Sequence, residues 1–314
     1  MAAIRIGVVG TGHFGRFHAL KLAERGCLSG LRNVDAARAA AVSAETGAPV
    51  LSEAELIARS DAVVVAVPTA HHHACGMRVL EAGCHLLVEK PMATSVAEAE
   101  ALVEAAARRR LVLQVGHIER HSAAIRTLRT SGAASNGAVA FNAVRVAPFR
   151  PRGLDVSVVL DLMIHDLDLL LDLAGSPLAE VRAVGRAVVT PFPDFAVAQL
   201  RFENGASGTF TASRVSVALE RRLRLLGPEG EIRVDFLARS LEALRPGGAE
   251  PAPAMPDGWG TDRTTWTEHD SLDAEHAAFI AAITEGAPVE ADGPTGLRAL
   301  DAALRVEAAI AGTR

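Results

Sequence analysis

The sequence has 314 residues, of which 49% are hydrophobic and 4% aromatic, and its formal net charge is −5. This length allows one large or two ordinary domains, and the acidic balance argues against nucleic acid as a partner. No apolar run reaches the roughly eighteen residues of a membrane span, the strand pattern starting at Ile4 leaves no room for a signal peptide, and three cysteines without metal-like or disulfide-like spacing suit the cytoplasm, where we expect the protein.

The first predicted element is a short apolar strand, residues 4–9, which runs into a glycine-rich turn. Gly10, Gly12 and Gly15 follow in the pattern G-x-G-x-x-G, and a helix is predicted over residues 16–25. A strand before this turn and a helix after it are typical of a dinucleotide-binding site. The first glycine permits the tight turn, the second lets the backbone approach a pyrophosphate, and the third allows the helix to pack on the strand.

The second predicted strand, residues 27–31, leads to the position that selects between NAD and NADP. An acidic residue there usually binds the adenosine ribose, whereas this sequence has Asn33, with Arg32 before it and Asp35 after it. Asparagine can bond a ribose hydroxyl, but it does not repel a 2′-phosphate, which Arg32 can attract. These residues are compatible with NAD and leave NADP open.

Residues 61–68 form a run that is fully apolar and rich in β-branched residues after Asp61, which predicts a strand inside a parallel sheet. Three adjacent histidines, residues 71–73, follow it and invite comparison with a metal site. Consecutive residues on a helical turn point in different directions, and no cluster of Cys, Asp and Glu residues supports them. We therefore favour a histidine beside the cofactor, His72, over a metal site.

The next predicted strand, residues 85–89, ends in the tripeptide Glu-Lys-Pro. This placement puts Lys90 at the carboxyl edge of the sheet, where ligands bind in open α/β folds. A helix and a strand over residues 95–115 complete the pattern. Residues 1–119 are thus predicted to form an α/β Rossmann domain that binds a dinucleotide.

Beyond residue 119 the pattern changes to short strands with tight turns, which indicates an α+β domain over residues 120–314. The final helix is expected to pack back toward the first domain. An antiparallel sheet covered on one face leaves the other face available, which favours a homo-oligomer, a dimer or a tetramer. The predicted helices cover 123–130, 156–174, 271–285 and 293–311, the strands cover 139–146, 180–189, 195–202, 207–213, 221–226 and 231–235, and 131–137 and 245–260 are predicted as a turn and a surface loop.

The predicted helix over residues 156–174 is apolar on nearly every side, yet it carries a polar stripe. Asp161, His165, Asp168 and Asp172 are spaced by four, three and four residues, which places them on one face. Buried carboxylates need partners, water or a ligand. The stripe is either a structural polar seam or part of an active site, and we favour the active site.

Taken together, the glycine motif, Glu89-Lys90-Pro91 and Asp161-x-x-x-His165 resemble the Gfo/Idh/MocA oxidoreductases, in that family's order and spacing. The resemblance covers essentially the whole chain. It implies a Rossmann domain, a second domain with an open, mainly antiparallel sheet, and an active site between them. It also implies an enzyme that acts on sugars or cyclitols with a nicotinamide cofactor, and no metal is expected.

The resemblance and the chemistry of the residues together give each site residue a role. His165 is the expected base, because the ordinary pKa of histidine lies near the operating pH. Asp161 would orient the ring or stabilise its cation, and Lys90 would bond the reacting oxygen. Asp168 and Asp172 are expected to support these groups. The residues predicted to bind the cofactor are Gly10, Gly12, His13, Phe14, Gly15, Asn33, Pro68, His72, Glu89 and Lys90.

Within the family, residues 116–120, 145–152 and 155–166 are most similar to members that oxidise the 3-hydroxyl of UDP-N-acetylglucosamine. Such members act ahead of an aminotransferase, on a route to 3-amino-modified lipid A. Residues 121–123 are His-Ser-Ala, where those members have Phe-Asn-Pro. The guanidinium groups of Arg145, Arg150 and Arg152 suit a diphosphate, although these arginines could equally be solvated loop side chains. The predicted substrate contacts are Arg120, Arg145, Arg150, Arg152, Asp161 and His165.

Two other functions stay open on these residues. One is a dehydrogenase of a free sugar or inositol, without a UDP group. The other is a non-catalytic ligand sensor on the same fold, which would tolerate the loss of Lys90 or His165. Because both residues are present, the sequence favours an enzyme.

Overall fold

The computed structural model describes residues 4–130, 137–151, 153–267 and 269–312, which form two compact units. The first unit contains residues 1–118 and 270–300, and the second contains residues 119–269 and 301–314. The chain thus leaves the first unit near the predicted boundary at residue 119 and returns to it once. Most of the turn predicted over residues 131–137 lies outside the described residues.

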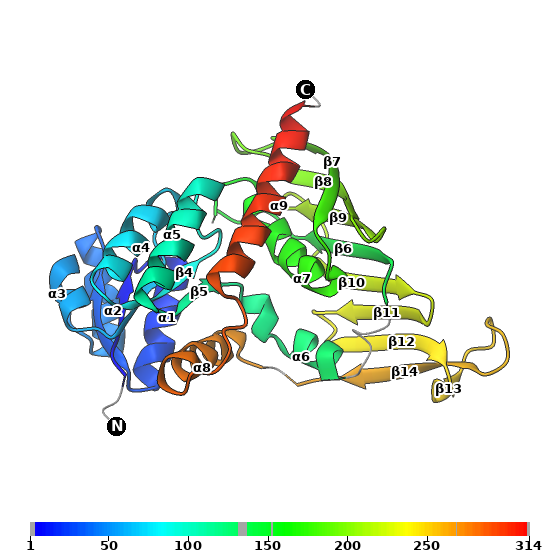
Figure 1. Ribbon diagram of the computed structural model, residues 1–314, viewed down its shortest axis with the longest axis horizontal. Helices are drawn as coiled ribbons and strands as arrows, with labels where there is room; N and C mark the ends of the chain where they lie inside the picture. Colours follow the sequence, from blue (N-terminus) through cyan, green and yellow to red (C-terminus); the bar gives the residue numbers. More distant parts are fainter. Residues whose placement is uncertain (1–3, 131–136, 152, 268, 313–314) are drawn as a thin grey trace. The chain divides into compact units, whose positions relative to one another are not determined.

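The first unit is built on a five-stranded parallel sheet with the order β2-β1-β3-β4-β5 (Figure 1). Every residue of β1 and β3 is buried, as expected when helices cover both faces of a parallel sheet. The strands are β1 (Ile6–Val9), β2 (Leu28–Arg32), β3 (Ala62–Val65), β4 (His85–Glu89) and β5 (Leu113–Gly116).

Six α-helices and a short 3₁₀ turn among the described residues accompany this sheet. They are α1 (His13–Glu24), α2 (Ala36–Thr46), α3 (Glu53–Ala58), η1 (Thr69–His71), α4 (His72–Glu81), α5 (Val96–Arg109) and α8 (Ser271–Thr284). The first helix begins at His13, three residues earlier than predicted, because Gly12 itself is its N-cap. The sequence reading missed α3, although Ser52 and Glu55 form a capping box at its start.

The glycine-rich turn between β1 and α1 packs backbone against backbone. A Cβ on Gly15 would lie 1.7 Å from the carbonyl oxygen of Gly10, and a Cβ on Gly10 would lie 2.4 Å from that of Ala66. Gly10 also has a φ of 95°, which side chains disfavour. A Cβ on Gly12, in contrast, would meet no atom within 4 Å. Gly10 and Gly15 are therefore required by the fold, whereas Gly12 leaves open space.

The second unit is built on a nine-stranded sheet with the order β13-β14-β12-β11-β10-β6-β9-β8-β7. Within this sheet, as far as its residues are described, only the β6–β9 pair is parallel. The predicted fold class, an α/β Rossmann domain plus an α+β domain with an open, mainly antiparallel sheet, is confirmed. The strands are β6 (Ala140–Val146), β7 (Leu178–Arg186), β8 (Phe195–Phe202), β9 (Ser207–Ser213), β10 (Glu220–Gly227), β11 (Gly230–Asp235), β12 (Ser240–Pro246), β13 (Glu250–Pro251) and β14 (Trp259–Thr265).

The surface loop predicted over residues 245–260 is wrong in part. β12 and β14 pair from Ser240↔Thr265 to Pro246↔Trp259, and β13 adds a short edge. The glycines there allow close approach of the backbone, since a Cβ on Gly248 would lie 2.2 Å from the backbone of Gly260. Glycine and proline usually indicate a loop, whereas here the glycines allow two backbone segments to pack closely and proline ends a strand.

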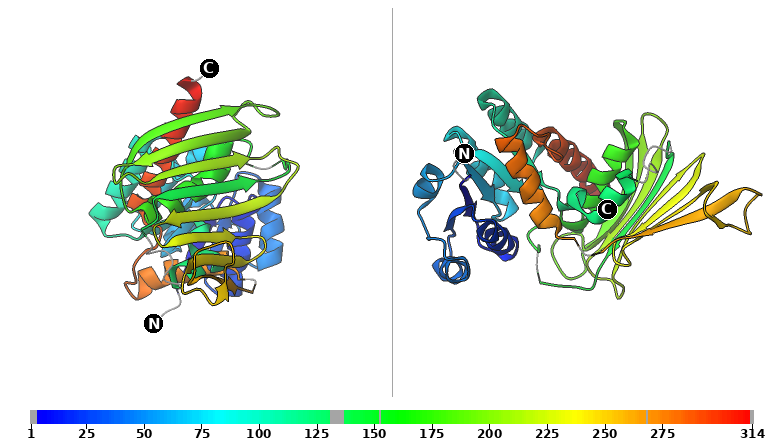
Figure 2. Two further views of the ribbon diagram at one scale, coloured as in Figure 1. Left: turned by 90° about the vertical axis from the view of Figure 1, so that its right-hand side faces the viewer. Right: turned by 90° about the horizontal axis from the view of Figure 1, so that it is seen from below.

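The helices of the second unit lie on one face of the sheet, and in Figure 2 the other face carries no helix among the described residues. The predicted helix over 156–174 begins as a π-helical segment, η4 (Val159–Met163), and continues as α7 (Ile164–Ala174). Sequence periodicity cannot distinguish these two helix types over a single turn. The remaining helical segments are η2 (Ile118–His121), α6 (Ala123–Thr130) and α9 (Gly293–Gly312), of which residues 301–312 belong to this unit.

We predict that alanine destabilises the protein at one glycine of this turn and is tolerated at another. Gly15→Ala forces its Cβ against the Gly10 carbonyl and should destabilise the protein by about 1–3 kcal/mol, the usual cost of overpacking. Gly12→Ala should leave the thermal midpoint nearly unchanged. Thermal unfolding of both variants beside the wild type measures this, and equal midpoints for the two variants would contradict it.

Candidate functional site

The N-terminus of α1 provides the features that a pyrophosphate requires. Gly12 offers no side-chain cap, and no acidic residue lies in the first turn. The first-turn N–H groups and the positive end of the helix dipole therefore suit an anion. Thr11 is buried, and its hydroxyl has no hydrogen-bond partner among the described residues. His13 and Phe14, in the first turn, are exposed. This turn fits a dinucleotide.

Asn33 lies directly after β2, as predicted for the residue that meets the adenosine ribose. It is half-buried, and its Oδ1 accepts the Val34 N–H at 3.0 Å. Its backbone oxygen accepts a hydrogen bond from the Arg32 guanidinium. Asp35, the next acidic residue, caps α2 by accepting from the N–H groups of Ala37 and Arg38. Asn33 thus remains the candidate for the ribose contact.

His72 connects two loops at the carboxyl edge of the parallel sheet. It is 1% exposed, its Nδ1 lies 2.8 Å from the carbonyl oxygen of Pro91, and its Nε2 lies 2.8 Å from that of Val67. Carbonyl oxygens only accept hydrogen bonds, so both ring nitrogens donate here. The ring thereby fixes the loop after β3 to the loop after β4. Pro68, in the loop after β3, is exposed.

Glu89 and Lys90 lie at the end of β4, at the same carboxyl edge. Lys90 is half-buried, and the bond between Lys90 and Pro91 is cis. The Glu89 carboxylate is 9% exposed, and it accepts from His18 Nε2 at 2.9 Å and from the Lys90 backbone N–H at 3.2 Å. The Glu89 side chain therefore points into the first unit, while Lys90 stays at its edge. The predicted cofactor contacts of both residues stay predictions.

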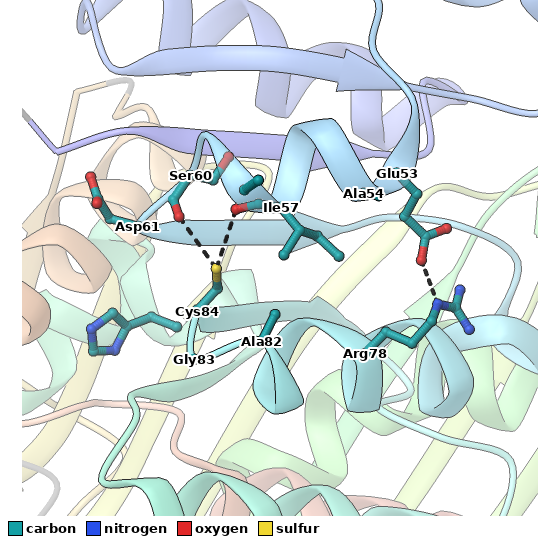
Figure 3. A pocket seen from close by; sticks show the side chains of 11 residues that line it. Glu53, Ala54, Ile57, Ser60, Asp61, Arg78, Ala82, Gly83 and Cys84 are labelled. Atoms are coloured by element: carbon teal, nitrogen blue, oxygen red, sulfur yellow. Dashed lines mark hydrogen bonds and ion pairs between the residues drawn. The ribbon is translucent and has the colours of Figure 1, made fainter.

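A hollow in the surface of the first unit lies away from this edge. It has a volume of about 980 Å³ and is lined by Glu53, Arg78 and Cys84, among others (Figure 3). Asp61 and His85, which also line it, stand at the amino ends of β3 and β4. Since ligands of open α/β sheets bind at the carboxyl ends, this hollow is not the candidate site.

In the second unit, Asp161 and His165 lie on adjoining turns of different helix types. Asp161 belongs to the π-helical segment η4 and is 7% exposed, whereas His165 belongs to α7 and is half-buried. A Cβ on Gly153 would lie 3.1 Å from the Asp161 carboxylate, so the preceding loop packs directly on it. π-Helical turns are frequent at functional sites.

A buried ion pair holds the segment that leads into η4. Arg214 donates to the carbonyl oxygens of Gly153 at 2.7 Å and Val156 at 2.6 Å, and it lies 3.5 Å from Asp194. Asp194 accepts from the backbone N–H groups of residues 188–190 at 2.7–3.0 Å. Burial alone would raise the pKa of Asp194, but these N–H donors outweigh it and lower the pKa to about 2.

Two predicted substrate arginines are instead bound inside the second unit. Arg145 is 4% exposed and contacts Asp166 at 2.8 Å and Glu119 at 2.7 Å. Burial disfavours its charge, but the two carboxylates outweigh this and raise its pKa. Arg120 is 5% exposed and contacts Asp168 at 2.7 Å. Carboxylates already bind both guanidinium groups. We therefore propose structural roles for Arg145, which was predicted to contact the diphosphate, and for Arg120, which was predicted to contact the substrate.

The other stripe and loop residues divide between support and exposure. Asp168 and the exposed Asp172 both face Arg120, at 2.7 and 3.5 Å, which agrees with the supporting role predicted for them. Arg150 is exposed, and Arg152 lies outside the described residues. Sequence reasoning missed the charged and polar residues that surround the predicted ones. In the first unit these are His18, Glu275 and His276, and in the second unit they are Glu119, Asp166, Asp194 and Arg214. The adjacent pairs Glu119-Arg120 and His165-Asp166 were the available signal, because buried charges occur in pairs.

A parallel sheet with the glycine turn at its carboxyl edge defines the class of dinucleotide-binding proteins. Residues 4–117 match the oxidoreductase family with an NAD-binding Rossmann fold, and residues 118–233 match the GFO/IDH/MocA C-terminal domain. The chain therefore belongs to the Gfo/Idh/MocA oxidoreductase family, and NAD is the cofactor of its Rossmann domain. Across the described residues, no helix is both long and apolar enough to cross a membrane.

The chain is similar over its full length to several sugar and inositol dehydrogenases. UDP-N-acetylglucosamine 3-dehydrogenase of Acidithiobacillus ferrooxidans is 42% identical over 99% of this chain and 98% of its own. A solved structure of that enzyme superposes with a TM-score of 0.93 at 41% identity, covering 99% of each chain. Scyllo-inositol 2-dehydrogenase (NAD(+)) of Bacillus subtilis is 25% identical over 99% of this chain and 93% of its own.

We predict that Asp194→Asn destabilises the protein in a pH-dependent way. A carboxyl group whose pKa falls from 3.8 to about 2 on folding contributes about 2 kcal/mol at pH 7. The pKa is lowered, so this contribution is present above pH 4 and is lost as the pH falls toward 2. Denaturant unfolding at pH 7, 4 and 2.5 measures the difference from wild type, which should shrink with pH.

The exposed Asp257 of the same unit provides the matched control. Asp257→Asn should leave the free energy of unfolding unchanged within about 0.5 kcal/mol. A constant deficit of Asp194→Asn at all three pH values would contradict the assigned role.

Proposed function

We propose that this protein oxidises the 3-hydroxyl of UDP-N-acetylglucosamine to a ketone, with NAD as the hydride acceptor. The observation that carries the proposal is the 42% identity over 99% of the chain to the enzyme that bears this activity in its name. The ketone would then be the substrate of an aminotransferase, on a route to 3-amino-modified lipid A. The competing substrate is a free sugar or inositol, as the names of more distant relatives indicate.

Three side chains and the cofactor share the chemistry. His165 accepts the proton of the sugar hydroxyl, and Asp161 orients the ring and stabilises its cation. Lys90 donates a hydrogen bond to the reacting oxygen and favours the developing alkoxide. When bound, the nicotinamide would accept the hydride that leaves the carbon bearing this hydroxyl. The hydroxyl oxygen thus loses its proton and the carbon that bears it loses a hydride, which gives the ketone, reduced cofactor and a proton.

The cofactor contacts of the proposal come from the first unit. The open space at Gly12 and the uncapped N–H groups of α1 support a pyrophosphate there. Asn33 would bond the ribose, and the absence of an acidic side chain at that position keeps NADP as a poorer second cofactor. Exposed His13 and Phe14 at the helix start are placed to cover it.

The diphosphate contact of the proposal rests on Arg150 and Arg152. Arg150 is exposed and lies before Gly153, whose φ is 62°, in the loop that packs on Asp161. An exposed guanidinium in this loop can bind a phosphate with paired hydrogen bonds. Arg120 and Arg145 act in the same region as structural ion pairs.

We also propose a homo-oligomer through the uncovered face of the second sheet, in the cytoplasm. Val184, which is 53% exposed, pairs with Val197 on this face, and Val197 pairs with Thr211. This row places apolar side chains on a sheet face without a helix. The three cysteines are free and buried, as suits a reducing compartment.

We predict that His165→Ala and Lys90→Ala each lower kcat at least roughly 100-fold, because each removes a group that acts on the reacting hydroxyl. NADH affinity should stay within about twofold. The assay supplies UDP-N-acetylglucosamine with NAD or NADP and follows reduced nicotinamide, with an aminotransferase and glutamate to remove the ketone.

His269→Ala, at an exposed histidine of the same unit, is the control and should keep wild-type turnover. Myo- and scyllo-inositol replace the nucleotide sugar in parallel. Turnover of an inositol alone would replace the proposed substrate. Wild-type turnover in His165→Ala would remove His165 as the base.

We predict that Arg150→Ala raises the KM for the nucleotide sugar roughly tenfold with little change in kcat, since a charge-assisted hydrogen bond contributes about 1.5–3 kcal/mol. Arg186→Ala, at another exposed arginine of this unit, should leave KM unchanged. Steady-state kinetics with both variants measures the effect. An unchanged KM in Arg150→Ala would count against the diphosphate contact.

A further inference from the structure

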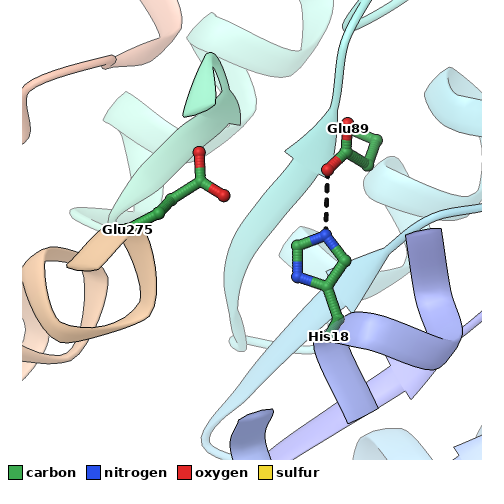
Figure 4. Close-up of side chains that lie close together, drawn as sticks. All are labelled: His18, Glu89 and Glu275. Carbon is green, nitrogen blue, oxygen red and sulfur yellow. Dashed lines mark hydrogen bonds and ion pairs between the residues drawn. The ribbon is translucent and has the colours of Figure 1, made fainter. Parts of the chain in front are cut away.

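A cluster of buried ionisable side chains lies inside the first unit, next to the end of β4. His18 of α1 and Glu275 of α8 are 0% exposed, and Glu89 of β4 is 9% exposed. Figure 4 shows Glu275 pointing toward the hydrogen-bonded pair of His18 and Glu89. One ligand atom of each residue lies within 4.8 Å of the others. No part of the proposed chemistry uses His18 or Glu275.

His18 connects the cluster to α8. Its Nε2 donates to the Glu89 carboxylate at 2.9 Å, and its Nδ1 lies 2.8 Å from Nε2 of His276. The imidazole is thus held at both nitrogens and cannot rotate without losing both bonds. It therefore fixes the orientation of Glu89.

Glu89 connects the cluster to Lys90. Its second carboxylate oxygen accepts the Lys90 backbone N–H at 3.2 Å. The Glu89 carboxylate packs closely against Gly116, since a Cβ on Gly116 would lie 2.9 Å from it. Burial would raise the pKa of Glu89, but the hydrogen bond from His18 and the charges of His18, Lys90 and His72 outweigh it and lower the pKa. Glu89 is therefore an ionised carboxylate that faces Lys90.

Glu275 has the opposite charge state. Neither of its carboxylate oxygens has a hydrogen-bond partner among the described residues. Burial and the charge of Glu89 raise its pKa well above the ordinary value. Two ionised carboxylates in one buried space are strongly unfavourable. The groups that face Glu275 are His18 from α1 and Glu89 from β4, while Gln114 of β5 donates only to its backbone oxygen.

We propose that His18, Glu89 and Glu275 form a positioning cluster for Lys90, in which Glu89 carries the single negative charge and Glu275 stays uncharged. His18 holds the Glu89 carboxylate, and that carboxylate holds the backbone and the charge of Lys90 at the carboxyl edge. The proposal rests on the proposed function only for the catalytic role of Lys90.

The same three side chains also have the types and spacing of ligands for a divalent cation. We favour the positioning cluster because His18 Nε2 and Glu89 already bond each other and because Glu89 is tied to Lys90. Metal analysis of the purified wild type decides between the two. A stoichiometric divalent metal that disappears in Glu275→Gln would overturn the positioning cluster.

The central test compares three neutral replacements. Glu89→Gln removes the charge, and it should lower kcat at least tenfold while KM for NAD and the NADH dissociation constant stay within twofold. His18→Asn should do the same. Glu275→Gln should keep kcat within twofold, because an amide replaces an uncharged carboxyl group. Glu45→Gln, at an exposed residue of this unit, is the control. A loss in Glu275→Gln equal to that in Glu89→Gln would overturn the proposal.

A second readout does not depend on turnover or on the identity of the substrate. The acylation rate of Lys90, followed by mass spectrometry at pH 8, should change several-fold in Glu89→Gln, because the carboxylate that accepts the Lys90 backbone N–H is replaced by an amide. It should not change in Glu275→Gln. An unchanged rate in Glu89→Gln would overturn the cluster, whereas a wild type that acylates as expected but does not oxidise UDP-N-acetylglucosamine would overturn only the proposed substrate.

Stability at two pH values tests the charge state of Glu275 directly. A carboxyl group with a raised pKa in the folded state stabilises the fold below the unfolded pKa and loses that contribution as the pH rises. Glu275→Gln does not titrate, so its denaturation midpoint should exceed that of wild type more at pH 8 than at pH 5. A midpoint difference that is the same at both pH values would overturn the uncharged state.

Discussion

The guanidinium of Arg145 lies between the carboxylates of Asp166 and Glu119, and the candidate base depends on this contact. Arg145 belongs to β6, Asp166 follows His165 in α7, and Glu119 lies where the chain enters the second unit. One buried cation thus joins the sheet, the helix and the entry segment. Because a buried charge without its partner is costly, α7 cannot turn on the sheet without breaking the pairing. The position of His165 on the sheet is therefore fixed by its neighbour.

The same physical rule explains which parts of the molecule could be predicted from the sequence. The glycine turn, the parallel strands and the Glu-Lys-Pro end of β4 follow from local patterns, since each depends on residues close in the chain. Arg145 and Arg120 look like substrate contacts in the sequence, and only the fold shows that Asp166 and Asp168 bind their guanidinium groups. The pairing of charges from distant elements has no local signature.

Two elements show the limit from the other direction. The segment over residues 245–260 carries proline and glycine, which usually indicate a loop. It nevertheless contains parts of β12 and β14, which pair with each other. The local sequence does not show that pairing. Likewise, His18 and Glu275 are separated by most of the chain, and nothing near either residue predicts that they meet. Long-range packing therefore decides both the edge of the second sheet and the surroundings of Glu89.

The π-helical segment before α7 has a consequence for how the polar stripe can change. Each residue of an α-helix turns the chain by about 100°, and a π turn holds one residue more than an α turn. Removing a single residue from Val159–Met163 would restore a regular helix and rotate everything before it by about that angle relative to His165. Asp161 would then face another side while Arg145 kept α7 in place. A single residue of the π-helical segment thus separates this candidate polar face from a different one on the same scaffold.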